Sequence, residues 1–155
     1  MIRDATRNDV PVITALMRDF AAFEELSEYF EATTEQLAAA MFGEHAFVNG
    51  LVAEDNGKVI AYALFYQNYA TFRGQRGMYL EDLFISQAHR GSGIGEAMIR
   101  RVAQIAKQQG CERIDFQVLE WNSSAIGFYE KLGADREETE RHFKFTDAAF
   151  EKLAT

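Results

Sequence analysis

The chain carries a glycine-rich turn, His89-Arg-Gly-Ser-Gly-Ile-Gly95, between two segments of different periodicity. Residues 78–85, before the turn, are mostly apolar and typical of a strand, and from Ile94 to about Gln109 apolar residues recur at helical spacing. Glycines at the start of a helix let main-chain N–H groups converge on a phosphate or pyrophosphate. Such a turn also serves as a plain connector between a strand and a helix, so by itself it leaves both interpretations open.

Strand-like and helix-like segments alternate along all 155 residues, with no repeat, no low-complexity tract and a single proline. We expect strands at 2–5, 51–54, 59–69, 78–85, 113–118, 136–139 and 142–146, and helices at 10–20, 34–43, 94–109 and 123–132. This order predicts the α/β class, as one domain over residues 1–155. Its sheet is expected to be mixed and largely antiparallel, with helices on both faces.

Local signals predict how these elements begin, end and pair. Asp55-Asn-Gly-Lys58 is typical of a tight hairpin turn, so the strands on either side of it should be antiparallel. The strand at 113–118 should be parallel to the one at 78–85, because a helix crosses over between them. Residues 70–77, with two glycines, are expected to form a loop, and residues after 146 a short acidic and aromatic tail.

Charge and composition narrow the classes of partner. Sixteen Lys and Arg against 24 Asp and Glu give a net charge of −8, which disfavours nucleic acid and favours cationic molecules. The single cysteine, Cys111, and three scattered histidines offer neither a disulfide nor a metal site. No apolar run is long enough for a membrane span and no secretory signal is visible, so we expect a cytoplasmic protein.

Three motifs in order resemble those of the GNAT acyl-CoA N-acyltransferases. Residues 90–95 match the signature Arg/Gln-x-x-Gly-x-Gly/Ala, the stretch Tyr79-Leu-Glu-Asp-Leu-Phe-Ile85 looks like the central strand, and Glu120 to Ala134 looks like the second CoA motif. The resemblance implies the GNAT fold, in which the central parallel strands splay apart, and acetyl-CoA as the acetyl donor. It implies no metal.

Within this family, the Tyr79 to Asp82 strand, the Glu120 to Tyr129 segment and Phe42 to Phe47 resemble the diamine acetyltransferases, the spermidine/spermine group. The resemblance implies direct transfer of acetyl to a primary amine in a ternary complex, by a homodimer. Related members use other amines, such as thialysine-like amino acids, and a protein amine is a further alternative. Arg73 and Arg76 also favour a zwitterionic amine. A non-catalytic CoA-binding module is the alternative from another class.

The resemblance also implies which residues hold the cofactor. The expected pantetheine contacts are the main chains of Leu83, Phe84 and Ile85, and the expected pyrophosphate contacts are the N–H groups of Arg90, Gly91, Ser92, Gly93, Ile94 and Gly95. Asn122 matches a loop asparagine that contacts CoA, and it fits the role of a helix N-cap equally well. Lys131 is positioned in the motif to reach the phosphates, although such lysines are commonly solvated helix surface.

Two residues match the catalytic groups proposed for the diamine group. Tyr129 would protonate the departing thiolate, with packing beside Phe128 as the alternative role. Glu81 would be the general base, acting through a water molecule. A carboxylate in a mostly apolar strand must be solvated or paired, which makes Glu81 informative. Strand alternation puts Glu81 and Asp82 on opposite faces unless a bulge intervenes.

The expected binding residues for the amine are acidic or aromatic. They are Glu24, Glu28, Asp82 and Trp121. Acidic residues at the end of the first helix are unfavourable for the helix dipole, which suggests a binding role, although a solvated acidic helix end is the competing explanation. Trp121 fits a wall of the amine site and a packing role at a strand end equally well.

Overall fold

The computed structural model describes all residues, 1–155, and they form two compact units, residues 1–117 and 118–155. The first unit contains a five-stranded sheet in the order β1-β2-β3-β4-β5. Its strands are β1 Ile2–Asp4, β2 Asn49–Asp55, β3 Lys58–Ala70, β4 Gln75–Ile85 and β5 Ile114–Asp115. Its helices are η1 Arg7–Asp9, α1 Val10–Phe23, η2 Ser27–Tyr29, α2 Thr34–Phe42, η3 Gln87–His89 and α3 Ile94–Gln108.

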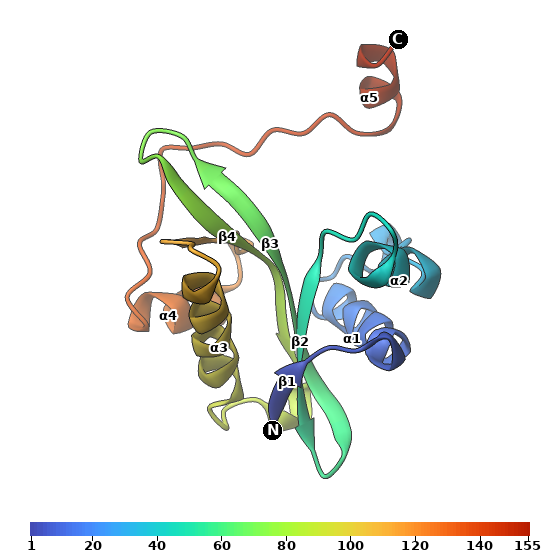
Figure 1. Ribbon diagram of the computed structural model, residues 1–155, viewed down its shortest axis with the longest axis vertical. Helices are drawn as coiled ribbons and strands as arrows, with labels where there is room; N and C mark the ends of the chain where they lie inside the picture. The colour runs from blue at the N-terminus through green and yellow to red at the C-terminus, as the bar shows by residue number, and fades with distance from the viewer. The chain divides into compact units, whose positions relative to one another are not determined.

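Helices cover both faces of this sheet (Figure 1). On one face α1 and α2 pack through Val10, Ile13, Leu16, Leu37 and Met41 against Val52, Tyr62, Leu64 and Phe84. On the other face α3 packs through Met98, Val102 and Ala106 against the remaining apolar positions of β2, β3 and β4. The spacing of four residues in α3 places these three side chains on one helical face. The predicted mixed sheet with helices on both faces is therefore confirmed.

The strand pairing follows the turn chemistry. Asn56 and Gly57 both have positive φ, 49° and 76°, as a tight hairpin turn between β2 and β3 requires. All neighbouring strands are antiparallel except β4 and β5, which are parallel as predicted. The β3–β4 connection is only the turn at 71–74, shorter than the predicted loop, because the strand pairing continues to Ala70 and Gln75.

The strand predicted at 113–118 forms only over Ile114–Asp115. Its pairing with β4 is limited to Met78 and Tyr79. Two residues beyond Tyr79, β4 carries a β-bulge, and bulges bend strands and end regular pairing. From Leu80 onward this side of β4 has no strand beside it, which agrees with the expected splaying of the parallel pair.

The second unit contains α4, Ser123–Lys131, and α5, Asp147–Leu153. The strands predicted at 136–139 and 142–146 are wrong, and the helix α5 was not predicted. Residues 142–146 alternate polar and apolar, but a strand needs a paired edge, and Phe143 and Phe145 are instead 87% and 68% exposed. Residues 136–139 contain no apolar side chain that could pack against a sheet.

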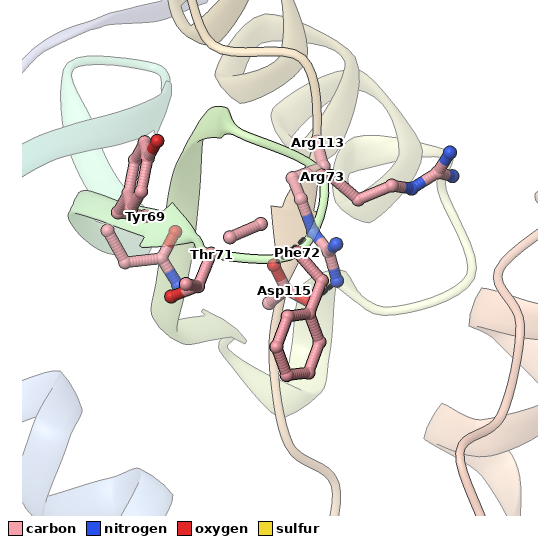
Figure 2. A pocket seen from close by; sticks show the side chains of 8 residues that line it. Tyr69, Thr71, Phe72, Arg73, Arg113 and Asp115 are labelled. Carbon is pink, nitrogen blue, oxygen red and sulfur yellow. Dashed lines mark hydrogen bonds and ion pairs between the residues drawn. The ribbon is translucent and has the colours of Figure 1, made fainter.

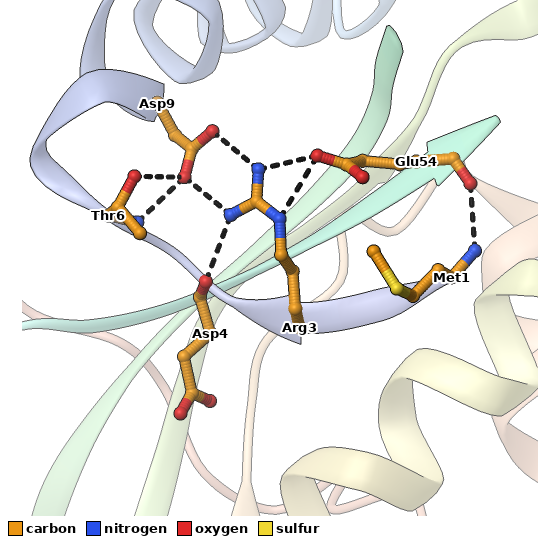
Figure 3. Close-up of polar contacts among 6 residues, drawn as sticks. All are labelled: Met1, Arg3, Asp4, Thr6, Asp9 and Glu54. Carbon is orange, nitrogen blue, oxygen red and sulfur yellow. Dashed lines mark hydrogen bonds and ion pairs between the residues drawn. The ribbon is translucent and has the colours of Figure 1, made fainter. Parts of the chain in front are cut away.

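An arginine joins the first strand to the start of α1 (Figure 3). Arg3 donates to both carboxylate oxygens of Asp9, at 2.7 and 2.9 Å, and to Glu54 Oε1 of β2 at 2.6 Å. The main-chain N–H and the hydroxyl of Thr6 also donate to Asp9 Oδ2. Hydrogen bonds from Arg3 and Thr6 hold the pKa of the buried Asp9 well below its usual range. This network fixes the entry of the chain into α1.

We predict that Asp9→Asn lowers the free energy of unfolding by about 2 kcal/mol at pH 7, because charge-assisted hydrogen bonds are lost. A depressed pKa stabilises the fold above the unfolded-state pKa of about 4, and the stabilisation is lost as pH falls from there toward the folded pKa. The difference between the variants in urea unfolding should therefore shrink from pH 7 to pH 3. The exposed Asp4→Asn is the control, and an equal loss at both pH values would contradict the account.

Candidate active site

One extra residue in β4 creates the local geometry of the candidate site. Leu64 of β3 pairs with Asp82, whereas the next residue of β3, Phe65, pairs with Leu80. Glu81 is thus the unpaired residue of a β-bulge. Leu80 lies on the α3 face of the sheet, and Asp82 lies opposite Leu64 on the α1 face. The bulge reverses the facing of the residues that follow it.

The bulge brings both carboxylates to the α1 face, each with its own tyrosine from β3. The Tyr62 hydroxyl donates to Asp82 Oδ2 at 2.9 Å, and the Tyr66 hydroxyl donates to Glu81 Oε2 at 3.0 Å. Tyr62 and Tyr66 are four residues apart on one strand, so they share a face. Strand alternation predicts that Glu81 and Asp82 lie on opposite faces unless a bulge intervenes. The bulge is present, so both carboxylates lie on one face and can act on one ligand.

A third carboxylate comes from the end of α1. Glu25 adopts a left-handed conformation, φ 60°, and the N–H groups of Glu25 and Leu26 bond the carbonyls of Ala22 and Ala21. This is a Schellman ending, here without glycine, and it fixes Glu24 as the C-cap residue of α1. Burial, and then the charge of Asp82, raise the pKa of Glu24. Phe20 of α1 stacks on Phe84 of β4 with 5.1 Å between ring centroids, so the end of α1 lies beside this part of β4.

The three carboxylates form no ion pair with a basic side chain of the protein. Burial raises the pKa of Asp82 to about 6, the hydrogen bond from Tyr62 lowers it, and the charge of Glu81 raises it further. Burial and the Glu81 hydrogen bond raise the pKa of Tyr66 to about 12. A partly buried acidic group without a basic partner is stabilised by a bound cation.

Next to these carboxylates, β4 presents a free main-chain edge. Ser86 N–H donates to Ile60 O of β3 at 2.9 Å, and paired positions of an antiparallel ladder alternate in the direction of their polar groups. The main chain of Phe84 is therefore directed to β3. Leu83 and Ile85 direct theirs to the side that β5 leaves free. Of the three residues predicted to bond pantetheine, Leu83 thus offers its N–H and its carbonyl, and Ile85 offers its N–H, since Arg90 Nε donates to Ile85 O.

The glycine-rich turn at the start of α3 fits an anion. Gly91 and Gly93 have φ of 76° and 84°, and a Cβ added to either would meet no atom within 4 Å. No group of the chain accepts a hydrogen bond from the N–H groups of residues 91–96. Exposed N–H groups at the start of a 15-residue helix are suited to a pyrophosphate.

Arg90 connects this turn to the acidic site. Its Nε donates to Ile85 O at 3.0 Å, and its guanidinium lies 4.2 Å from the ring centroid of Phe23 and 5.3 Å from that of Phe84. Stacking on two rings orients the guanidinium. Arg90, which is predicted to contact the pyrophosphate, therefore has its side chain fixed by contacts with α1 and β4.

The second unit holds the remaining predicted residues. Asn122 is the N-cap of α4 and accepts from the N–H of Ala125 at 3.2 Å, so the capping role is confirmed. Burial raises the pKa of Tyr129 to about 12, and its ring lies edge-on to Phe128, 5.0 Å between centroids. Lys131 is exposed in the last turn of α4 and Trp121 is 53% exposed.

Two other predicted residues, Glu28 and Arg76, are not linked to the three carboxylates by any hydrogen bond or ion pair. Glu28 is exposed on η2, and no interaction links it to Asp82. Arg76 donates to Gln67, which bonds Gln109 at the end of α3, so Arg76 lies on the opposite face of the sheet. Arg76 therefore does not lie where it could contact an amine bound by the three carboxylates.

A cavity of about 370 Å³ lies at the β3–β4 turn (Figure 2). It is lined by Asn68, Tyr69, Ala70, Thr71, Phe72, Arg73, Arg113 and Asp115. Arg113 is bound to Asp115 through two hydrogen bonds of 2.7 Å. None of the residues predicted to bind the cofactor or the amine directly lines this cavity, although Arg73, which favours a zwitterionic amine, does. Asp115 of the lining pairs with Tyr79, two residues before Glu81 on β4.

A family model for the acetyltransferase (GNAT) family matches residues 12–134. The chain belongs to the GNAT acetyltransferases. A thialysine N-epsilon-acetyltransferase of Bos taurus is 38% identical over 165 residues, covering 99% of this chain and 96% of that protein. A human spermidine/spermine N(1)-acetyltransferase-like protein 1 is 35% identical over 140 residues, covering 86% of this chain and 20% of that protein.

The fold is shared with solved structures. An integron cassette protein from the mobile metagenome of V. cholerae superposes with a TM-score of 0.80 at 26% identity, covering 99% of this chain and 96% of the other. No helix of this GNAT chain has the length and apolar character needed to cross a membrane. No group of three or more His, Cys, Asp or Glu side chains is arranged to hold a metal ion.

Two residues of the site were missed from the sequence, Tyr62 and Tyr66. They lie in an apolar strand, where aromatic residues usually mean packing. Their signal was their spacing, because residues four apart in a strand share a face. If the strand at 59–69 is expected to pair with the strand that contains Glu81 and Asp82, the two tyrosines on its one face become candidates to bond these carboxylates.

Proposed function

We propose that this acetyltransferase moves the acetyl group of acetyl-CoA to a primary amine of a small cationic molecule, with a polyamine or diamine foremost, by direct attack in a ternary complex. One observation carries the proposal: the carboxylates of Glu24, Glu81 and Asp82, without basic partners, gather beside a free main-chain edge. A cation compensates the carboxylates, and an extended pantetheine arm can add to a free edge as a strand does.

The residues divide the work as follows. Asp82 and Glu24 bind the ammonium group, with Glu28 and Trp121 as further contacts, and Glu81 accepts its proton through a water molecule. An N–H of Leu83 or Ile85 polarises the thioester carbonyl, so that the neutral amine attacks its carbon as the C–S bond breaks. Tyr129, whose hydroxyl is protonated at neutral pH, gives a proton to the sulfur, and the second proton lost by the attacking nitrogen returns to Tyr129 through solvent. Acetyl-CoA supplies the acetyl group.

Residues of the glycine-rich turn and of the second unit are proposed to bind CoA. The N–H groups of residues 91–95 and the side chain of Arg90 bind the pyrophosphate, and Asn122 and Lys131 add contacts to CoA. Because the family model spans residues 12–134, across the boundary between the units, we propose that both belong to one domain. The resemblance to diamine acetyltransferases further favours a cytoplasmic homodimer.

A second candidate substrate is a thialysine-like amino acid. The Bos taurus relative, 38% identical, carries the name of that activity, and its side-chain amine has the same chemistry as the end of a diamine. The difference lies at the other end of the molecule, which is zwitterionic. The carboxylates at the site favour the substrate that carries additional positive charge instead.

We predict that the purified protein with acetyl-CoA acetylates terminal amines of diamines and polyamines, read by mass spectrometry and by thiol release. Thialysine, ornithine and lysine test the second candidate, and the ratio of kcat/KM between the classes decides between them. Acetyl-CoA binding in calorimetry without product from any amine would support a non-catalytic CoA-binding module and overturn the proposal.

We predict that Tyr129→Phe lowers kcat by about 100-fold, because a proton donor acts in the transition state, while the Kd for acetyl-CoA changes by less than about twofold. The phenyl ring keeps the packing against Phe128. Calorimetry and steady-state kinetics measure the two quantities. Equal losses in binding and turnover would assign Tyr129 to packing instead of proton transfer.

A further inference from the structure

Tyr62 is held rigidly beneath the acidic site. Its side chain is fully buried, 0% exposed, in the centre of the sheet. Its ring lies 6.3 Å from that of Phe84, which stacks on Phe20 of α1 at 5.1 Å and an interplanar angle of 12°. A ring packed on this scale leaves the hydroxyl a single position. That position is occupied by the hydrogen bond to Asp82.

The hydrogen bond orients the Asp82 carboxylate. Tyr62 donates to Oδ2 at 2.9 Å, and Oδ1 accepts no hydrogen bond from the chain. The residue is only partly covered, and Oδ1 is not a fully buried oxygen without a partner, so it remains available to a ligand. Glu81 is bonded by Tyr66 in the same way, which gives two matched pairs on adjacent residues of one bulge.

The groups that face Asp82 are almost all anionic or neutral. They are Glu24 at the end of α1, Glu81 on β4, and the hydroxyls of Tyr62 and Tyr66 on β3. The guanidinium of Arg90 lies 5.3 Å from the centre of the Phe84 ring and forms no ion pair with Asp82. Arg90 uses its Nε on Ile85 O. Inside this group only Tyr62 donates a hydrogen bond to Asp82 and favours its charged form.

We propose that Tyr62 is a positioning residue for the amine substrate: its hydroxyl holds Oδ2 of Asp82 and leaves Oδ1 to receive the ammonium N–H. This inference rests on the proposed function and gives the two tyrosine–carboxylate pairs different roles in it. The Tyr62–Asp82 pair sets the affinity for the cation, and the Tyr66–Glu81 pair serves the proton transfer.

The pH dependence follows from the same contact. Burial raises the pKa of Asp82 to about 6, and the Tyr62 hydrogen bond acts in the opposite direction. Cation binding needs the ionised form, so KM for the amine rises as pH falls through about 6. Loss of the Tyr62 hydroxyl raises the Asp82 pKa further. The rise in KM must then begin at a higher pH.

The test is Tyr62→Phe, which removes one oxygen atom and keeps the ring. We expect KM for the amine at pH 8 to rise about tenfold with kcat within about twofold, the loss of one hydrogen bond to a charged group. The low-pH rise in KM should move to higher pH, and NMR of ¹³C-labelled aspartate should show the Asp82 titration moving with it.

Tyr66→Phe is the matched control, because it removes the same atom from the other pair. It should leave the pH at which KM rises in place. An unchanged KM and titration in Tyr62→Phe, or an identical shift in both variants, overturns the inference while the proposed function stands. A wild-type protein that acetylates no amine overturns the proposed function itself.

A double-mutant cycle separates positioning from packing. In an Asp82→Asn background, Tyr62→Phe should change KM by less than about twofold, because residues that act through one contact are not additive. A tenfold effect that persists in this background would show that Tyr62 acts through the core and not through Asp82. Asp82→Asn alone should also remove the rise in KM near pH 6.

Discussion

One unpaired residue, Glu81, sets the geometry on which the site depends. Without the bulge, regular alternation would keep Asp82 on the α3 face with Leu80, inside the apolar core. With it, two adjacent carboxylates share one face and each meets a tyrosine of β3. The bulge also lies where the pairing of β4 with β5 has ended. A charged face and a free edge thus meet within one short segment of strand.

Local backbone conformation at the ends of the neighbouring helices positions the other functional groups of the site. The Schellman ending of α1 places Glu24, and the positive φ angles of Gly91 and Gly93 expose N–H groups at the start of α3. Arg90 lies between them, stacked on Phe23 and bonded to Ile85 O. An acidic group for a cation and an amide cradle for an anion therefore flank the same strand.

The sequence was most informative where local chemistry decides the structure. Asn56-Gly57 and the four-residue spacing of Met98 and Val102 predicted the hairpin and α3 correctly. Residues 136–139 and 142–146 were wrongly predicted as strands, because a short stretch of sequence does not reveal that no partner edge is present. The bulge at Glu81 was only one of two alternatives, since register depends on the facing strand. Tyr62 and Tyr66 stayed hidden for the same reason.

The bulge places two carboxylates where they can bind one amine, beside a free strand edge that can bind the pantetheine arm of the thioester. A crystal structure with CoA and an unreactive amine analogue tests it most directly. The account predicts pantetheine hydrogen-bonded to the main chains of Leu83 and Ile85, and the amine nitrogen about 3 Å from Asp82 Oδ1. An amine bound instead in the cavity beside Arg113, with the β4 edge unoccupied, would contradict it.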